Sequence, residues 1–196
     1  MRTGMTPLRT SALIPCVAWM LTASAAPVPL DLKAPELIAN GSFEEGPEVS
    51  VHLPLDANSE AIKGWIVTRG QIDYCDTHWK NAHGKRSLDL HGSPGYGGVK
   101  QTIKTEKGAT YRVTFQMAGN PGVGSKKMTL AVWANKQTKG FEFDCTDKTI
   151  EDMGWAKHTW DFKADADETV IEIATTMKED QFGGPALDGV SVKRLK

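Results

Sequence analysis

The chain has 196 residues and a formal net charge of −1, with 24% charged and 40% hydrophobic residues. This balance supplies no basic stripe that could neutralise a row of phosphates, so nucleic acid is excluded as the expected partner. No run of residues is apolar for long enough to cross a bilayer as a helix. The length suits a leader followed by one domain with a substantial core.

The first 25 residues have the features of a signal peptide. Arg2 and Arg9 make the start basic, residues 11–22 are largely apolar, and Ala23-Ser24-Ala25 is a small-x-small pattern that a signal peptidase accepts. We therefore predict cleavage after this pattern and export to the periplasm or the cell exterior. Because the leader holds two arginines and no acidic residue, the mature domain, residues 26–196, has a net charge of about −3.

Most of the mature chain has the pattern of short strands. Tyr111, Val113, Phe115 and Met117 alternate with polar residues, which is the two-residue period of a half-buried strand. Because no amphipathic helical stretch separates the strands, we predict an all-β fold, an antiparallel β-sandwich or barrel. Similar runs, bounded by turn residues, predict strands at 87–91, 100–104, 128–132, 141–144, 158–163 and 169–175.

Three segments lack a clean period and are predicted to be loops. Residues 47–62 form the longest, with a short helical turn expected around 59–63. Residues 92–98 and 119–125 are rich in Gly and Pro. Loops on a rigid sandwich are where recognition usually occurs.

Two short signatures bracket the mature domain, Asn40-Gly41-Ser42-Phe43-Glu44 and residues 184–192. In the second, Asp188 shares a strand face with Val190 and Val192 under the two-residue period. A buried carboxylate needs a partner, and a hard cation is a natural one. If the first and last strands lie side by side, Glu44 and Asp188 could meet at a structural Ca²⁺.

Two cysteines remain in the mature domain, Cys75 and Cys145. In an oxidising compartment they could close a disulfide that stabilises the fold by roughly 4 kcal/mol on the chain-entropy model. Two unpaired buried thiols are the equally open alternative.

The common catalytic motifs are absent from the sequence. It contains no Gly-x-Ser-x-Gly elbow, no His-Glu-x-x-His pair, no Gly-Lys-Ser/Thr loop and no Cys-x-x-Cys pair. Asp73, Asp76, Asp89 and Glu142 could supply a carboxylate pair for glycoside hydrolysis, but the sequence places no two of them at the required separation. We therefore predict a protein that is not an enzyme, with a glycan hydrolase as the minor alternative.

Aromatic residues give a stronger signal for binding, because sugar-binding proteins stack a ring against the apolar face of a pyranose. Trp133 lies on the polar side of its predicted strand, and Trp79 and Tyr96 lie in or beside Gly-rich loops. These three rings are candidates for an outward platform, with Asp73 as a polar contact. The alternative is that they join the remaining tryptophans in the core.

An ordered set of motifs runs through nearly all of the mature domain. The motifs are Ile72-Asp73-Tyr74, Trp79, Gly84 to Leu90, Gln101-Thr102-Ile103, Thr110 to Phe115, Ala118 to Pro121, Phe141 to Asp144, Met153-Gly154-Trp155 and Gly184 to Val192. This set resembles the bacterial choice-of-anchor C family, which is related to plant cell-wall proteins of domain of unknown function 642. The resemblance implies a galactose-binding-like jelly-roll β-sandwich, and it implies that Glu44 and Asp188 are side-chain ligands of a structural Ca²⁺.

Many members of that family carry a C-terminal sorting anchor, whereas this sequence stops directly after its last predicted strand. We therefore expect a protein that is released or is held by what it binds. The predicted function is binding of carbohydrate in a cell wall or extracellular matrix, without chemistry, by a monomer. The alternative is a structural or adhesive envelope protein that contacts other proteins.

Overall fold

The computed structural model describes residues 1, 29, 31, 33–92, 95–178 and 182–196. The predicted signal peptide, apart from Met1, lies outside these residues. The described residues form eleven β-strands and no helix, which confirms the all-β prediction, and none of them belongs to a helix that could span a membrane. The strands are β1 (His52–Asp56), β2 (Ile66–Arg69), β3 (Gln71–Cys75), β4 (Ser87–Asp89), β5 (Gly98–Lys104), β6 (Thr110–Gly119), β7 (Lys127–Ala134), β8 (Gln137–Asp144), β9 (Ala156–Lys163), β10 (Glu168–Thr175) and β11 (Pro185–Arg194).

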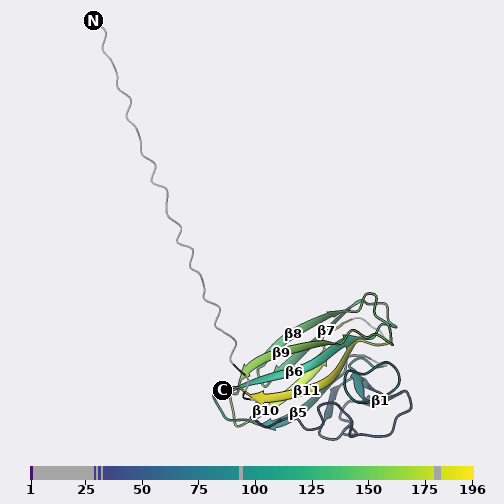
Figure 1. Ribbon diagram of the computed structural model, residues 1–196, viewed down its shortest axis with the longest axis horizontal. Coiled ribbons are helices and arrows are strands. Elements are labelled where there is room, and N and C mark those ends of the chain that lie inside the picture. The colour runs from purple at the N-terminus through teal and green to yellow at the C-terminus, as the bar shows by residue number, and fades with distance from the viewer. Residues whose placement is uncertain (2–28, 30, 32, 93–94, 179–181) are drawn as a thin grey trace.

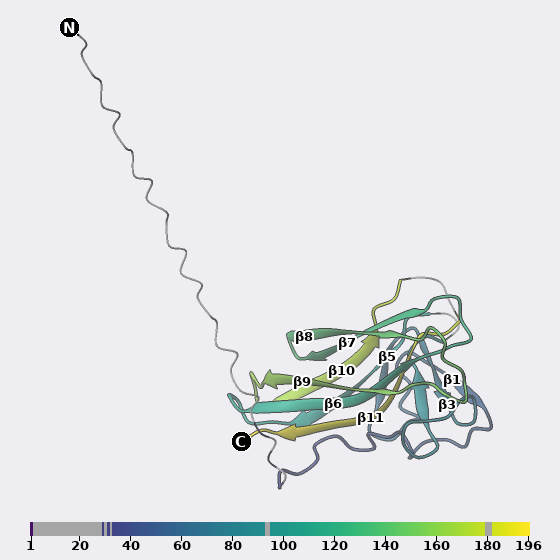
Figure 2. The same cartoon turned by 45° about the horizontal axis from the view of Figure 1, so that its top comes forward.

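The strands form two antiparallel sheets that are packed as a sandwich (Figure 1). Sheet 1 has six strands in the order β1-β3-β4-β11-β6-β9, and sheet 2 has five strands in the order β2-β5-β10-β7-β8. Figure 2 shows β9, β6 and β11 side by side, while β1 and β3 lie at the end of the molecule away from the C-terminus. This architecture is the predicted jelly-roll β-sandwich.

The inner faces of both sheets share one hydrophobic core. The alternation predicted for β6 is present, since Tyr111, Val113 and Phe115 are 3%, 0% and 0% exposed while Arg112 and Thr114 are half-buried. Leu130 of β7 and Leu187 of β11 belong to the same core. Burying each such side chain contributes about 1.5–3 kcal/mol, so these alternating faces hold the two sheets together.

The segment 47–62 is not a loop throughout, because it contains β1. This strand lies at the edge of sheet 1, where it pairs with β3 and places Leu55 opposite Ile72. Leu55 is its one buried residue, and Pro54 removes a backbone donor, so the sequence shows no clear alternation. The helical turn predicted at 59–63 is wrong, since this stretch is irregular.

The opening signature lies against β11 without forming a strand. Leu37 N donates to Val192 O, and Val190 N donates to Gly41 O at 2.8 Å. The approach is so close that a Cβ on Gly41 would lie 1.9 Å from Val190 O. The first strand, β1, is not a neighbour of β11, so the hypothesis that the terminal strands are adjacent is wrong. The opening signature itself takes the place beside β11.

Asn40 organises the turn of this signature. Its backbone has a φ of 53°, and its Nδ2 donates to Glu45 O and Lys63 O, each at 2.9 Å. Its Oδ1 accepts from Glu45 N at 3.0 Å, and its carbonyl accepts from Trp65 Nε1 at 2.9 Å. These bonds fix the backbone around Glu44.

Cys75 and Cys145 are both free, buried thiols, so the disulfide considered from the sequence is not formed. Cys75 packs with Trp79 and Met153 on the outside of sheet 1, whereas Cys145 belongs to the main core. Burial raises the pKa of both thiols, which keeps them protonated and poorly reactive.

Candidate functional site

Residues 76–86, here called the crossing loop, join β3 to β4 and cover part of the outer face of sheet 1. Cys75, Ala118 and Ala186 on that face form a second hydrophobic cluster with Trp79 and Met153. All five are 4% exposed or less. The small side chains of the sheet leave room for the indole, so Trp79 anchors the loop. The prediction of an outward Trp79 ring is therefore wrong.

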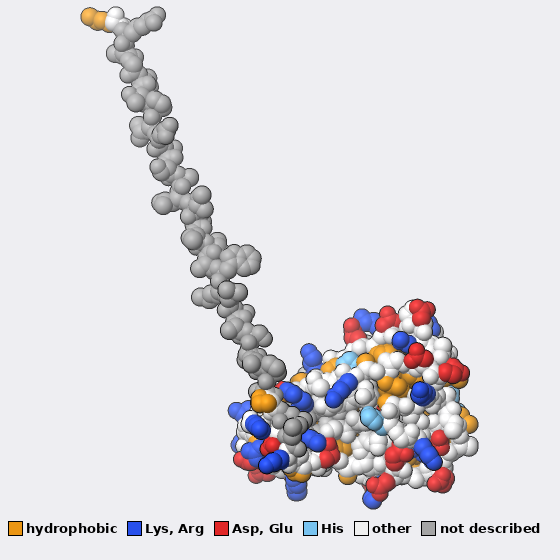
Figure 3. All heavy atoms as spheres, viewed as in Figure 1, with side chains coloured by type: hydrophobic (Ala, Val, Ile, Leu, Met, Phe, Trp, Pro, Cys, Tyr) orange, Lys and Arg blue, Asp and Glu red, His pale blue; other side chains and the backbone are white. Residues whose placement is uncertain are grey.

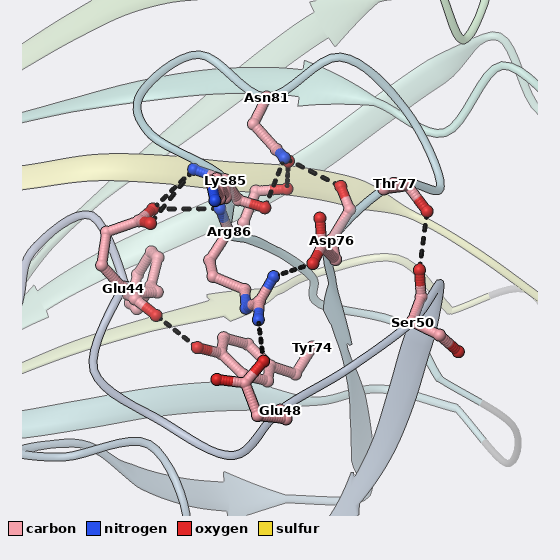
Figure 4. A network of polar contacts seen from close by, with 11 residues as sticks. Glu44, Glu48, Ser50, Tyr74, Asp76, Thr77, Asn81, Lys85 and Arg86 are labelled. Carbon is pink, nitrogen blue, oxygen red and sulfur yellow. Dashed lines mark hydrogen bonds and ion pairs between the residues drawn. The ribbon is translucent and has the colours of Figure 1, made fainter.

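Hydrogen bonds from Trp79 run through the inside of the crossing loop. Trp79 Nε1 donates to Ser87 Oγ at 2.8 Å, and this hydroxyl donates to Asn81 Oδ1 at 2.5 Å. Asn81 Nδ2 donates in turn to the carbonyls of Asp76 and Lys85 at 2.8 and 2.7 Å. Figure 4 shows Asn81 between these two parts of the loop, whose ends it ties together.

Two carboxylates accept hydrogen bonds from backbone N–H groups of the crossing loop. Glu44 accepts hydrogen bonds from Lys85 N at 2.9 and 3.1 Å and from Arg86 N at 3.0 Å (Figure 4). Asp188 Oδ2 accepts from His83 N at 2.7 Å. Burial raises the pKa of Asp188 to about 7; its backbone hydrogen bonds lower it and the charge of Glu44 raises it further. The two signatures of the sequence therefore meet at one loop.

Arg86 is a third support. It is 8% exposed, forms an ion pair with Asp76 and lies 3.6 Å from a Glu48 oxygen. Its guanidinium also lies 5.7 Å from the centroid of the Tyr74 ring, and the Tyr74 hydroxyl donates to Phe43 O at 2.5 Å. Figure 4 shows that this network connects the crossing loop with the opening signature.

A cleft of about 550 Å³ opens between the crossing loop and residues 146–155, here called the facing segment. Lys80 N donates to Ile150 O at 2.9 Å, and Trp155 Nε1 donates to Lys80 O at 2.9 Å, so the two segments are tied together. A second hollow of about 400 Å³ shares Lys80, Asn81 and Glu151 with the cleft. The cleft is lined by Asp76, Thr77, His78, Trp79, Lys80, Asn81, Gly84, Lys85, Ile150 and Glu151.

Asp89 is a second buried carboxylate, on β4. It lies opposite Asp73 of β3 and accepts hydrogen bonds from His91 N at 3.0 Å, Gly184 N at 2.9 Å and Asn120 Nδ2 at 3.0 Å. Burial raises its pKa to about 7, although these hydrogen bonds favour the ionised form. Asp89 thus joins the segment after β4, the segment after β6 and the segment before β11 through hydrogen bonds, and we assign it a structural role.

Asp73 lies behind the cleft. Burial raises its pKa, and the nearby His52 and His78 oppose this shift. The His78 ring, which lines the cleft, lies between His52 and Trp79. Its centroid is 5.6 Å from that of His52 and 4.9 Å from that of Trp79. Asp73 and Asp89 line neither the cleft nor the second hollow.

The other two predicted rings lie elsewhere. Tyr96 follows β4, is 39% exposed, and donates from its hydroxyl to Lys178 O at 2.5 Å. Trp133 is half-buried on the outer face of sheet 2, where the Arg69 guanidinium lies 5.4 Å from its ring centroid. The structure therefore does not bring the three rings together into one platform, and only Trp79 belongs to the cleft.

The sequence did not single out most of the cleft residues, such as Thr77, Lys80, Ile150 and Glu151. They lie in irregular segments without a period. The sequence does show a polar segment between two strands, residues 76–86, which is the crossing loop. Its backbone meets the facing segment through contacts between residues 70 to 75 positions apart, such as the hydrogen bond from Trp155 Nε1 to Lys80 O, which no local pattern reveals.

The donor chemistry around Glu44 and Asp188 suits a hard cation. Calcium takes about six to eight oxygen ligands, and a carboxylate has about four lone-pair sites, so both groups keep acceptor capacity beyond their bonds to backbone N–H groups. Among the described residues, no group of three or more His, Cys, Asp or Glu gathers around a common point. Calcium binding by Glu44 and Asp188 therefore stays a prediction, in which other oxygens would have to complete the shell.

Comparison with known proteins places the chain in a family. The pattern of the family described as "Protein of unknown function (DUF642)" matches residues 36–193, so the chain belongs to this family. It is 28% identical over 167 residues to halomucin of Haloquadratum walsbyi, covering 81% of this chain and 2% of that protein. It is 26% identical over 168 residues to "Protein DUF642 L-GALACTONO-1,4-LACTONE-RESPONSIVE GENE 2" of Arabidopsis thaliana, covering 81% of this chain and 43% of that protein. The chain thus spans less than half the length of these curated relatives.

Solved structures share the fold. The tandem CBM22-1-CBM22-2 domains of Paenibacillus barcinonensis Xyn10C superpose with a TM-score of 0.53 and 18% identity, covering 89% of this chain and 47% of that chain. TmCBM61 in complex with β-1,4-galactotriose gives a TM-score of 0.50 and 18% identity, covering 82% of this chain and 99% of that chain. The fold is therefore the jelly-roll β-sandwich of carbohydrate-binding modules.

Proposed function

We propose that this protein binds carbohydrate, without chemistry, in the cleft between the crossing loop and the facing segment. One observation carries the proposal. The wall of the cleft is a loop whose shape is fixed in advance by Glu44, Asp188 and Arg86, on the fold of carbohydrate-binding modules. A pre-formed concave site with a few fixed polar groups is what small-ligand recognition needs.

The lining of the cleft suits a sugar. Thr77, Lys80 and Glu151 offer donors and acceptors for hydroxyl groups, while Ile150, which is 44% exposed, offers apolar contact. Because the loop is already hydrogen-bonded, binding orders few additional groups and the entropic cost is small.

Recognition without hydrolysis follows from what the nearby carboxylates already do. A glycosidase needs two carboxyl groups facing one glycosidic bond. Asp76 pairs with Arg86, and Glu44 and Asp188 accept hydrogen bonds from backbone N–H groups. In our proposal these groups shape the cleft and take no part in proton transfer.

The setting that we propose is extracellular. Export through residues 1–25, action as a monomer at a cell wall or extracellular matrix, and a place in the choice-of-anchor C group are parts of the same proposal. Calcium held by Glu44 and Asp188 would supply positive charge to two carboxylates and stabilise the meeting point of the two signatures, since an ion bound only by the folded state stabilises by mass action.

Retention on immobilised polysaccharides tests the proposed function. A panel of neutral β-1,4-galactan, xylan and β-glucans should include at least one polymer that retains the protein. The double variant Lys80→Ala/Ile150→Ala removes two cleft side chains but no hydrogen bond that shapes the loop, and it should weaken binding about tenfold.

The matched control is Lys136→Ala/Phe182→Ala, which also removes one exposed lysine and one exposed apolar side chain, neither of which lines the cleft. It should bind like the unchanged protein. The proposal is wrong if no glycan retains the protein, or if both double variants lose binding equally.

A further inference from the structure

A third hollow, here called the groove, lies further along the outer face of sheet 1 and is distinct from both the cleft and the second hollow. It is a shallow groove of about 350 Å³ and shares no lining residue with the cleft. Its polar lining is His83, Thr114, Gln116, Lys157, Ser191 and Lys193.

The strand register explains why these side chains gather. Lys157 of β9 lies opposite Gln116 of β6, and Lys193 of β11 lies opposite Arg112 of β6. Because alternate residues of a strand share a face, Arg112, Thr114 and Gln116 all lie on the outside of the sheet. The two lysines therefore stand on either side of a polar strip along β6.

The two lysines of the groove each carry a positive charge. Among the described residues, Lys157 and Lys193 take part in no ion pair. Asp161 of β9, which lies opposite Arg112 across the sheet, accepts two hydrogen bonds of 2.6 and 2.7 Å from the Arg112 guanidinium. The groove thus presents two ammonium groups, with Glu36 as the acidic side chain that borders it.

One carboxylate borders the groove and is also engaged. Glu36 Oε2 accepts from Ser191 Oγ at 2.6 Å, and its Oε1 accepts from Val192 N at 2.8 Å. It fixes the N-terminal segment to β11, and so its acceptor atoms face the strand.

His83 forms a wall of the groove because β11 has an irregularity there. The register of β11 shifts between Asp188 and Ser191, and Gly189 has a φ of 58°. A Cβ on Gly189 would lie 2.5 Å from His83 Cδ2, so only a glycine leaves room for the imidazole. The hydrogen bond from His83 N to Asp188 holds the same residue from the backbone side.

We infer that this groove binds the anionic unit of an acidic polysaccharide, through the carboxylate of a uronic acid or a sulfate ester. Two unpaired ammonium groups attract the anion, and the hydroxyl and amide groups between them suit the neighbouring sugar hydroxyls. Figure 3 shows Lys and Arg side chains over the part of the surface where Figure 1 labels β6, β9 and β11. This site goes beyond the proposed function, since it needs neither the cleft nor a neutral glycan.

Affinity electrophoresis in gels that contain polygalacturonate tests the inference. The polymer should retard the protein, its methyl ester should not, and added salt should weaken the effect because the charges are exposed. Lys157→Gln/Lys193→Gln should bind about five- to tenfold more weakly. The control Lys136→Gln/Lys139→Gln has the same net charge but changes exposed lysines outside the groove, and it should stay within about twofold of the unchanged protein.

Equal binding by the unchanged protein and Lys157→Gln/Lys193→Gln would overturn the inference, and so would equal retardation by polygalacturonate and its methyl ester. A gel with dextran sulfate separates the two anion sources, since selective loss of either polymer in Lys157→Gln/Lys193→Gln supports the groove and names the anion. The cleft variant Lys80→Ala/Ile150→Ala should keep its binding to the acidic polymer. The two proposals can therefore fail independently.

Discussion

Two arginines, one beside each sheet of the sandwich, show how differently the surroundings of the two sheets are used. Each guanidinium lies near an aromatic ring, at 5.7 Å for Arg86 and 5.4 Å for Arg69, and each forms an ion pair, with Asp76 and Glu172 respectively. The side chain of Arg86 is 10% exposed, whereas that of Arg69 is 46% exposed. The same two kinds of contact therefore stabilise a buried loop beside sheet 1, whereas on sheet 2 they lie at the exposed surface.

The difference extends to the whole of each face. Loops build outward from sheet 1 and form the cleft, whereas the outer face of sheet 2 carries exposed ion pairs such as Lys104 with Glu168 and Lys127 with Glu142. Exposed pairs of this kind contribute little to stability. The comparison indicates that binding sites should be sought on sheet 1.

Two glycines provide the sharpest contrast in stability. Gly41→Ala places a Cβ 1.9 Å from Val190 O, so β11 must move, and we expect the free energy of unfolding to fall by about 3 kcal/mol. Gly140→Ala on sheet 2 meets nothing within 4 Å, and the change should be below about 0.5 kcal/mol. Urea unfolding of both variants measures the difference. Similar values would mean that the opening signature does not pack on β11.

The arginine pair gives the next largest effect. Arg86→Met leaves Asp76, which is 19% exposed, without its partner and should reduce the free energy of unfolding by about 2–3 kcal/mol. Arg69→Met breaks an exposed pair and should cost less than about 1 kcal/mol. Equal losses in urea unfolding would contradict the distinction between the two faces.

The smallest expected effect concerns pH. Burial raises the pKa of Asp188 to about 7 in the folded protein, against an ordinary value of 3.8. Between these values the folded state keeps a proton that the unfolded state has released, so the free energy of unfolding decreases as pH rises from about 4 to 7. Asp188→Asn should reduce this decrease by roughly 1–2 kcal/mol. Asp89, whose pKa is also raised to about 7, adds a decrease in the same range that this variant retains.

Added calcium gives a further test, because it should change the pH dependence of the free energy of unfolding. An ion held by Glu44 and Asp188 favours the ionised carboxylate, so added Ca²⁺ should flatten the pH dependence and raise the thermal midpoint relative to chelator. Urea and thermal unfolding at pH 5 and 7.5 would show both effects. If the chelator changes neither quantity, the calcium proposal fails.

Strands that cross the middle of the sandwich could be predicted from sequence, because their two-residue alternation runs for six residues or more, as in β6 and β10. The short strands β1, β2 and β3 could not, although the short strand β4 was predicted. β2 and β3 are separated by Gly70 alone, whose φ is 50°, and β1 buries a single side chain. In such strands tertiary pairing decides the structure, and the local pattern carries too little information.

The site shows the same limit. Asp188 was recognisable as a carboxylate on an apolar strand face, but its partner, His83 N, lies 105 residues away in an irregular loop. The Gly-rich surroundings of Trp79 predicted exposure, whereas Ala118 and Ala186 on separate strands provide a place for its ring. Residues that are brought together only by the order of strands in the sheet show no pattern in a single sequence.

Backbone amide chemical-shift mapping during titration with a retained neutral oligosaccharide tests the central claim most directly. We predict that the largest shifts occur in residues 76–86 and 149–155, which surround the cleft, and that Lys80→Ala/Ile150→Ala reduces them. Largest shifts around Trp133 on the outer face of sheet 2 would contradict the claim and assign recognition to the opposite side of the sandwich.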